Sequence, residues 1–402
     1  MNLKSRSSPR VSDSLYEEVT QHDYFGLPGE IFCMAVDISD NTIFLFTESA
    51  LYTVSPSGTT ALLSGDEHSN GFADGCRALA RFSGPRGMAL DREKKLMYVA
   101  DTGNHVVRII QLRSGYVQTV AGRGEEHGFL DGVGDAARFS TPVSIVLSSN
   151  DSIYVCDKKN HALRRVVLGG HEENPFGPFM GVPLPAVVTT LCGGTMYGLR
   201  ARAYVGGSFL PALHTIKLDG ARDGPCNVAL FYNPMSIALD SHNNIIVADY
   251  GNSMIRSVNP ASGTTTTLVG MHSSRSWVHG RWHCDGSSDV AIINHPTSVC
   301  VDEFNNIIVA DCNNNQLRLI RSCGTVLTLA GGSTHRADGR PPPHQHAVDG
   351  RGATVRFNQP QQVMLDHRGV LHVVEKSNEF WTRRLSYDAR PSESNAAGSA
   401  SG

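Results

Sequence analysis

The sequence predicts an all-β protein, a six-bladed β-propeller built from four-stranded antiparallel blades. The first observation is a repeated Asp-Gly pair, followed eight positions later by Phe or Ile and eleven positions later by proline. The second is an acid that closes an apolar run at a nearly constant distance from the pair, and the third is a last apolar run that ends in glycine. Such self-similarity predicts a repeat architecture, and units of four short strands predict propeller blades. The pairs begin at Asp74, Asp131, Asp223, Asp285 and Asp349.

One unit shows how the strands are assigned. Residues 82–110 contain an apolar run after Pro85, a charged turn, a second run ending in YVAD, a polar turn TGNH and a third run VVRII. Alternating apolar runs separated by turn residues predict short strands. The fourth strand of this unit is TVAG, which ends at Gly122.

The repeats divide the chain into blades. We expect a propeller over residues 14–386, with tails at 1–13 and 387–402 that are too polar and small to bury a core and are expected to be disordered. The last copy lacks a fourth strand, and residues 15–21 (LYEEVTQ) are expected to supply it, so that no sheet edge stays open. The blades are expected at about 31–65, 74–122, 131–193, 223–270, 285–331 and 349–386.

The motifs carry a family resemblance. The run DG, ARF and P, followed by YVADTGNHVVRII and TVAG, resembles the NHL repeat, and the resemblance covers about residues 30–385. It implies interaction or scaffolding roles, and in tripartite-motif relatives the propeller binds RNA or protein through one face. A propeller hosts many activities, so the resemblance predicts the fold more directly than the function.

Composition excludes some classes of protein. Charged residues are 18% of the chain and the net charge is -3, which gives no overall electrostatic case for nucleic acid or an anionic membrane. The nine cysteines contain no CxxC pair, so disulfides are not expected to organise the fold. The N-terminus lacks a secretory signal, and we expect a cytoplasmic protein. The basic Lys4, Arg6 and Arg10 also fit a short mitochondrial presequence.

An arginine follows the acid that closes strand two at plus 7 in four blades. One interpretation makes the acids metal ligands around the channel. The other, favoured because it repeats in every such blade, is a structural buried ion pair. The last blade departs, with Glu375 and then Arg383 at plus 8, and the first has Glu48 and Ser55. The four pairs are Asp101 with Arg108, Asp157 with Arg164, Asp249 with Arg256, and Asp311 with Arg318.

The asparagine three positions after each acid is predicted to be structural, in a left-handed or side-chain-capped turn conformation. These residues are Asn104, Asn160, Asn252, Asn314 and Asn378.

Three connections between blades are long, and they follow Gly193, Gly270 and Gly331. In propellers such connections open on the same face as the turns between strands two and three, so we expect one loop-bearing face. The insertion at 169–186 joins strands three and four and is expected on the opposite face. Function is often carried by such loops.

The long connections hold the candidate partner-binding residues. Trp277 and Trp282 are candidates because tryptophan is enriched in interface hot spots. Basic residues on the same predicted face add a possible RNA surface. These are Arg200, Arg202, Arg275, Arg281, Arg336 and Arg340. A zinc set is conceivable from His279, His283, Cys284, His344 and His346, but its spacing matches no specific motif, and neither a metal nor a cofactor is expected.

The usual catalytic motifs are absent: there is no GxSxG, HExxH or GxxxxGK. Lactonase propellers place one metal at the channel, while amidoglycolate lyase propellers carry histidines after the strand-one proline. Here those positions are Arg86, Val143, Met235, Thr297 and Gln361, which disfavours the lyase. We therefore expect a non-enzymatic platform for a protein partner, without membrane attachment. The alternatives are an RNA-binding propeller and a metal-dependent hydrolase or lactonase at the channel mouth.

Overall fold

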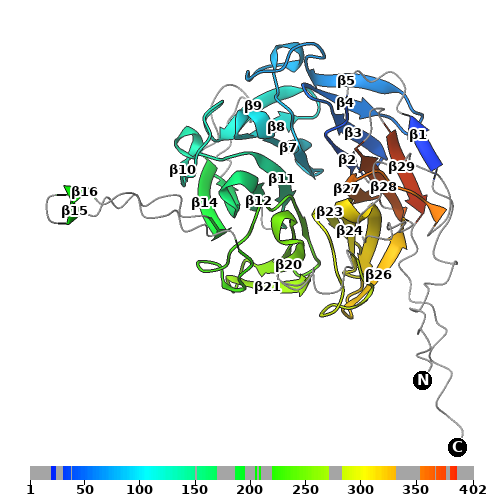
Figure 1. The fold of residues 1–402 in the computed structure, drawn as a ribbon. Helices are drawn as coiled ribbons and strands as arrows, with labels where there is room; N and C mark the ends of the chain where they lie inside the picture. The colour runs from blue at the N-terminus through cyan, green and yellow to red at the C-terminus, as the bar shows by residue number, and fades with distance from the viewer. Residues whose placement is uncertain are drawn as a thin grey trace, which may run out of the picture.

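The computed structural model describes residues 20–23, 30–37, 39–149, 152–169, 186–194, 204–205, 208–209, 220–270, 283–331, 354–366, 368–376 and 381–386. Within these ranges the chain forms six antiparallel sheets arranged as the blades of a propeller, which confirms the predicted fold (Figure 1). No helix in this part of the chain is long and apolar enough to cross a membrane.

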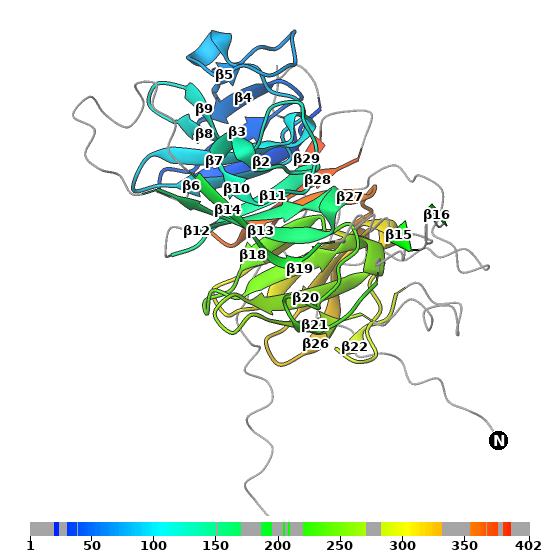
Figure 2. The same ribbon diagram turned by 90° about the vertical axis from the view of Figure 1, so that its left-hand side faces the viewer.

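Each blade runs from an inner strand at the axis to an outer strand at the rim. The first three blades contain β2 (Cys33–Asp37), β3 (Thr42–Phe46), β4 (Ala50–Val54) and β5 (Thr60–Gly65); β6 (Gly87–Asp91), β7 (Leu96–Asp101), β8 (Val106–Gln111) and β9 (Tyr116–Ala121); and β11 (Pro142–Leu147), β12 (Ser152–Asp157), β13 (Ala162–Leu168) and β14 (Ala186–Gly193). Figure 2 shows the sheet of β11–β14 beside that of the fourth blade.

The remaining blades repeat this order. They contain β18 (Ser236–Leu239), β19 (Ile245–Asp249), β20 (Met254–Asn259) and β21 (Thr264–Val269); β23 (Pro296–Val301), β24 (Ile307–Asp311), β25 (Gln316–Ile320) and β26 (Thr325–Ala330); and β27 (Pro360–Leu365), β28 (Val370–Glu375), β29 (Trp381–Ser386) and β1 (Thr20–Asp23). A separate hairpin pairs β15 (Tyr204–Val205) with β16 (Ser208–Phe209).

The N-terminal strand closes the last blade, as predicted. Strand β1 pairs antiparallel with β29, with Thr20 opposite Arg384 and Asp23 opposite Trp381 (Figure 1). The described strand begins at Thr20, later than the expected 15–21, whose residues 15–19 lie outside the described part. The chain ends are thus paired in one sheet, and the outer edge of β29 is covered.

Three sheets contain a fifth strand that the sequence analysis did not predict. Two-residue strands in the Asp-Gly segments pair with the outer strand of their own blade, and each is followed by a turn back toward the axis. They are β10 (Gly132–Val133), β17 (Gly224–Pro225) and β22 (Gly286–Ser287).

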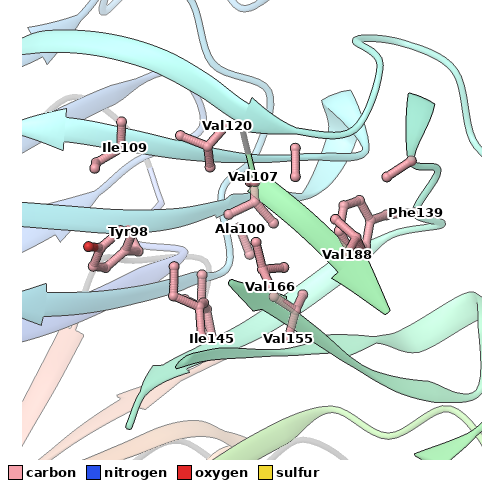
Figure 3. Packing of buried hydrophobic residues seen from close by; sticks show 14 of the residues in the cluster. Tyr98, Ala100, Val107, Ile109, Val120, Phe139, Ile145, Val155, Val166 and Val188 are labelled. Atoms are coloured by element: carbon pink, nitrogen blue, oxygen red, sulfur yellow. The ribbon is translucent and has the colours of Figure 1, made fainter. Parts of the chain in front are cut away.

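The core lies between neighbouring blades. Apolar residues that alternate along the strands meet those of the next sheet and form a separate buried cluster at each of the six junctions. Between the second and third blades, Tyr98 and Ile109 face Ile145 and Val166 (Figure 3). Burial of both faces explains why the strands carry continuous apolar runs.

Polar side chains on the inner strands link each blade to the next. The side-chain oxygen of Ser144, Ser236, Ser298 or Gln362 accepts the backbone N–H of Ile237, Val299, Val363 or Met34, respectively, at 3.0 to 3.2 Å. At the corresponding place in the second blade, a Cβ on Gly87 would lie 2.8 Å from Ser144 Cα, so glycine permits direct backbone contact there. At four of the blade junctions, one N–H group of an inner strand is therefore satisfied by a side chain of the preceding blade.

Candidate functional site

Each of the four predicted acid–arginine pairs is formed and buried. The acid is the last residue of strand two, the arginine is in strand three of the same sheet, and both side chains are 0% exposed. The contacts from NH1 to Oδ2 are Arg108–Asp101 at 3.0 Å, Arg164–Asp157 at 2.9 Å, Arg256–Asp249 at 3.2 Å and Arg318–Asp311 at 2.9 Å.

The acid also organises its own turn. In the third blade Asp157 Oδ1 accepts the Ser140 backbone N–H at 2.7 Å, and Oδ2 accepts Asn160 Nδ2 at 2.8 Å. Burial raises the pKa of Asp157 to about 6, with Arg164 and these hydrogen bonds opposing the rise. This carboxylate has no exposed atom with which to meet a ligand.

A second carboxylate binds each arginine, and this contact was not predicted from the sequence. It is the aspartate of the Asp-Gly pair: Arg164 NH2 lies 2.7 Å from Asp131 Oδ1, and Asp131 also accepts the backbone N–H and hydroxyl of Thr190 on strand four, each at 2.9 Å. The equivalent contacts join Arg108 to Asp74 at 2.8 Å, Arg256 to Asp223 at 2.7 Å and Arg318 to Asp285 at 2.7 Å. The signal was available, since each Asp-Gly aspartate lies 33 or 34 residues before its arginine.

The recurrent phenylalanine packs on the same guanidinium. The arginine Cζ lies 4.7 Å from the ring centroid in Arg108–Phe82, 5.1 Å in Arg164–Phe139 and 4.4 Å in Arg256–Phe231. A cation against a ring face adds to the ion pairs in holding strand three to the segment before strand one. The Asp-Gly, Phe and Arg positions therefore form one structural unit inside each of these blades.

The sixth blade keeps its pair despite the different spacing. Arg383 Nε lies 2.9 Å from Glu375 Oε1, and Arg383 packs 5.6 Å from the Phe357 ring centroid. Arg383 is opposite Val373 in the sheet, two residues before the acid, which is the register of the other arginines. The turn has one more residue, so the sequence departs from the pattern while the side chain keeps its place.

The first blade replaces the pair. At the register where the others have arginine, β4 has Tyr52, opposite Leu45 and beside the same bulge. Glu48 lies instead in the tight turn, is exposed, and accepts Asn70 Nδ2 at 3.2 Å. The Glu48 and Ser55 positions compared in the sequence are thus not the structural equivalents.

The turns between strands two and three are hydrogen-bonded to the next blade. The left-handed residue is not the recurrent asparagine but the one after it, while the asparagine side chain donates a hydrogen bond to the acid. This next residue accepts a backbone N–H from the following blade: His105 Nδ1 from Thr141 at 3.1 Å, His161 Nδ1 from Asn233 at 2.8 Å, Ser253 Oγ from His295 at 3.2 Å and Asn315 Oδ1 from Gln359 at 2.8 Å.

Described flanks of two long connections lie at or beside these turns. The Gly194 N–H donates to the His161 carbonyl at 3.0 Å, Asn252 Nδ2 donates to the Gly220 carbonyl at 3.3 Å, and Gln316 Nε2 donates to the Gly331 carbonyl at 3.3 Å. The flanks of the connections at 195–219 and 332–353 therefore lie on the face of the strand-two to strand-three turns. We call this the loop-bearing face.

Most candidate binding residues lie outside the described part of the chain. This holds for Trp277, Trp282, Arg200, Arg202, Arg275, Arg281, Arg336, Arg340, His279, His344 and His346. Of the suggested zinc set, His283 and Cys284 are described, and the Cys284 carbonyl accepts Arg318 NH2 at 2.9 Å. Among the described residues, no three His, Cys, Asp or Glu side chains are grouped to hold a metal.

The positions after the strand-one prolines line a central cavity of about 320 Å³. They are Arg86, Val143, Met235, Thr297 and Gln361, and Phe32 takes this place in the first blade. Both apolar and polar residues line the described wall, and Arg86 is the one charged residue among them.

Family models match two parts of the chain. A model of the teneurin NHL domain matches residues 218–400, and a model of the NHL repeat matches residues 139–165. The matches fall on the repeats whose structure is given above.

Two curated relatives illustrate the sequence similarity. The chain is 24% identical over 290 residues to Protein SUPPRESSOR OF QUENCHING 1, chloroplastic, from Arabidopsis thaliana, which covers 64% of this chain and 26% of that protein. It is 25% identical over 306 residues to human NHL repeat-containing protein 2, which covers 62% of this chain and 40% of that protein. The chain therefore spans less than half the length of either relative.

Solved structures share the fold. An auxiliary nutrient binding protein from Bacteroides thetaiotaomicron is 12% identical, with a TM-score of 0.56 over 94% of this chain and 74% of that one. Virginiamycin B lyase from Staphylococcus aureus is 8% identical, with a TM-score of 0.50 over 93% of this chain and 100% of that one. At such identities the likeness concerns the fold alone.

Proposed function

We propose that this NHL-repeat β-propeller is a non-enzymatic interaction platform that binds a protein partner through its loop-bearing face. The observation that carries the proposal is the anchoring of the long connections. For two of the connections the described flanks are hydrogen-bonded at or beside the strand-two to strand-three turns, at Gly194 and Gly220 for one and at Gly331 for the other. Variable segments held at a rigid rim are a common way for a scaffold to present a binding surface.

The chemistry of the repeats supports binding over catalysis. Asp101, Asp157, Asp249 and Asp311 are 0% exposed, and each is paired with an arginine. The Asp-Gly aspartates are engaged by the same arginines. The repeated charges thus stabilise the blades, and the varying residues of the connections are left to recognise a partner, with Trp277 and Trp282 as the proposed anchors.

The test compares the intact chain with two variants, a version with replaced loops and a matched control. In the first, residues 272–282 and 333–352 are each replaced by the eight-residue 123–130 connection, which leaves the described flanks intact. In the matched control, residues 171–184, which join β13 to β14 on the opposite face, are replaced by a short Gly-Ser linker. Each version, and the intact chain, is cross-linked in cells and purified, and the bound proteins and RNA are quantified.

The proposal predicts that a defined set of proteins is cross-linked to the intact chain and to the control but lost from the first version. Equal recovery with all versions would contradict the loop-bearing face as the contact surface. Loss of RNA rather than protein from the first version would replace the proposal by the RNA-binding alternative.

A further inference from the structure

Apolar side chains line much of the central cavity. The inner strands of all six blades contribute to it, and its volume is about 320 Å³, at the lower end of the range for small-molecule sites. Its wall includes Met34, Met88, Ile145, Ile237, Val299 and Val363. These apolar side chains favour contact with an apolar group over bulk water.

The polar side chains of the wall are already used. Ser144, Ser236, Ser298 and Gln362 each accept a backbone N–H of the next blade. Since these oxygens satisfy protein donors, they offer little to a polar ligand deep in the channel. The interior therefore suits a hydrocarbon body better than a sugar or a nucleotide.

The mouth of this cavity on the loop-bearing face is cationic. Arg86 begins the inner edge of the second blade, is exposed, and lies with its Cζ 4.8 Å from the Phe32 ring centroid. Lys158 begins the strand-two to strand-three turn of the third blade on the same face and is half-buried. Within the described part of the chain, neither cation forms an ion pair.

The two charges influence each other. The pKa of Lys158 is lowered, first by burial and then by the charges of Lys159 and Arg86. The neighbouring carboxylates of Asp101 and Asp157 are 0% exposed and are ion-paired with Arg108 and Arg164 instead. An anion placed between Arg86 and Lys158 would relieve their repulsion and gain charge-assisted hydrogen bonds.

We propose that the central channel binds a small organic carboxylate, whose apolar body lies among the inner strands and whose carboxylate meets Arg86 and Lys158 at the mouth. Arg86 supplies a planar pair of donors and Lys158 a point charge. This site is independent of the proposed function, because it uses the channel rather than the long connections.

The probe is octanoate, used below its micelle concentration and titrated calorimetrically into the full chain. Octanol and inorganic phosphate test the two halves of the ligand separately. The variants are Arg86→Gln and Lys158→Gln for the charges, and Met235→Trp to obstruct the cavity while keeping both cations. Arg113→Gln, which removes an exposed cation in the β8–β9 turn at the other end of the blade, is the matched control.

The proposal predicts saturable binding of one octanoate per chain. Arg86→Gln and Lys158→Gln each weaken it at least tenfold, Met235→Trp abolishes it, and Arg113→Gln leaves it unchanged, with thermal unfolding verifying that every variant is folded. Octanol binding as tightly as octanoate would overturn the role of the cations. Phosphate competing as tightly as octanoate would overturn the role of the cavity, and the absence of saturable octanoate binding would overturn the site altogether.

Discussion

Arg383 lies opposite Val373 in the sixth blade, in the same register in which Arg318 lies opposite Val309 in the fifth. The two arginines are reached by turns of different length and bind acids of different length, Glu375 and Asp311. The position of the guanidinium in the sheet is therefore kept, and the turn and acid are adjusted to it.

Removing one buried arginine should destabilise the whole propeller. We expect Arg164→Met to lower the free energy of unfolding by about 3–5 kcal/mol, because Asp157 is left buried without its partner. The neighbouring Arg165→Met, which loses only bonds to Ser152 Oγ, should cost about 1 kcal/mol. Urea unfolding followed by circular dichroism gives both values. Equal losses in the two variants would show that the buried pair has no special role.

Aspartate and glutamate should not be interchangeable at the acid positions of the blades. Glu375→Asp shortens the side chain by one carbon, so Arg383 loses its 2.9 Å contact, while Asp311→Glu crowds a fully buried site. Each should cost about 1–3 kcal/mol, against a change near zero for the exposed Glu303→Asp. Thermal unfolding measures the loss, and hydrogen exchange should show it first in β28 and β29 for Glu375→Asp. A stable Glu375→Asp variant with unchanged exchange would contradict this account of the longer turn.

Removing the closing strand should expose a sheet edge. A chain without residues 1–23 loses the β1–β29 pairing, and we expect a lower unfolding temperature by several degrees and self-association through β29. A chain without residues 1–13 is the control and should remain like the full chain. Light scattering during size-exclusion chromatography measures the mass. Identical mass and unfolding temperature for both truncations would argue against closure by β1.

Low pH should destabilise the junction between the second and third blades. Burial and the charge of His127 lower the pKa of His105, whose Nδ1 must stay unprotonated to accept the Thr141 N–H. As pH falls below about 6.5 the unfolded chain takes up this proton before the folded one, so stability is full above that pH and decreases below it.

The variant His105→Asn isolates this effect, because Asn315 already does the same task in the fifth blade. We expect it to match the parent at pH 7.5 and to lose less stability at pH 5, as read from urea midpoints. Some pH dependence should remain, since burial also lowers the pKa of His295. The same pH dependence in parent and variant would count against His105 as a source.

The repeat spacing was enough to predict the fold, the N-terminal closure and the four regular ion pairs, because identical sheets impose identical spacing. The changed spacing of Glu375 and Arg383 was visible, but not that Arg383 keeps the register of the other arginines, because register is set by strand pairing rather than by chain count. The first blade was misread for the same reason, since Tyr52 takes the arginine place without any acid to mark it. The expected closing strand at 15–21 overlaps β1 (Thr20–Asp23) at Thr20 and Gln21, and residues 15–19 lie outside the described part of the chain.

The site was less predictable than the fold. The spacing between each Asp-Gly aspartate and its arginine is nearly constant, but in the sequence the aspartate indicated only a repeat and not a second carboxylate on the arginine. The channel cations could not be paired from sequence, because Arg86 and Lys158 belong to different blades and no motif links them. The tryptophans and arginines of the long connections remain predictions.

The pairing of Thr20 with Arg384 also constrains how the protein is made. The partner of β1 is synthesised about 360 residues later, so at about 5–20 residues per second β1 waits roughly 20–70 s before its partner is made. Until β29 is made, blade six cannot be completed and the ring keeps an open seam there. Chaperones that shield this seam during translation should therefore affect the yield of folded protein more than those that act after release.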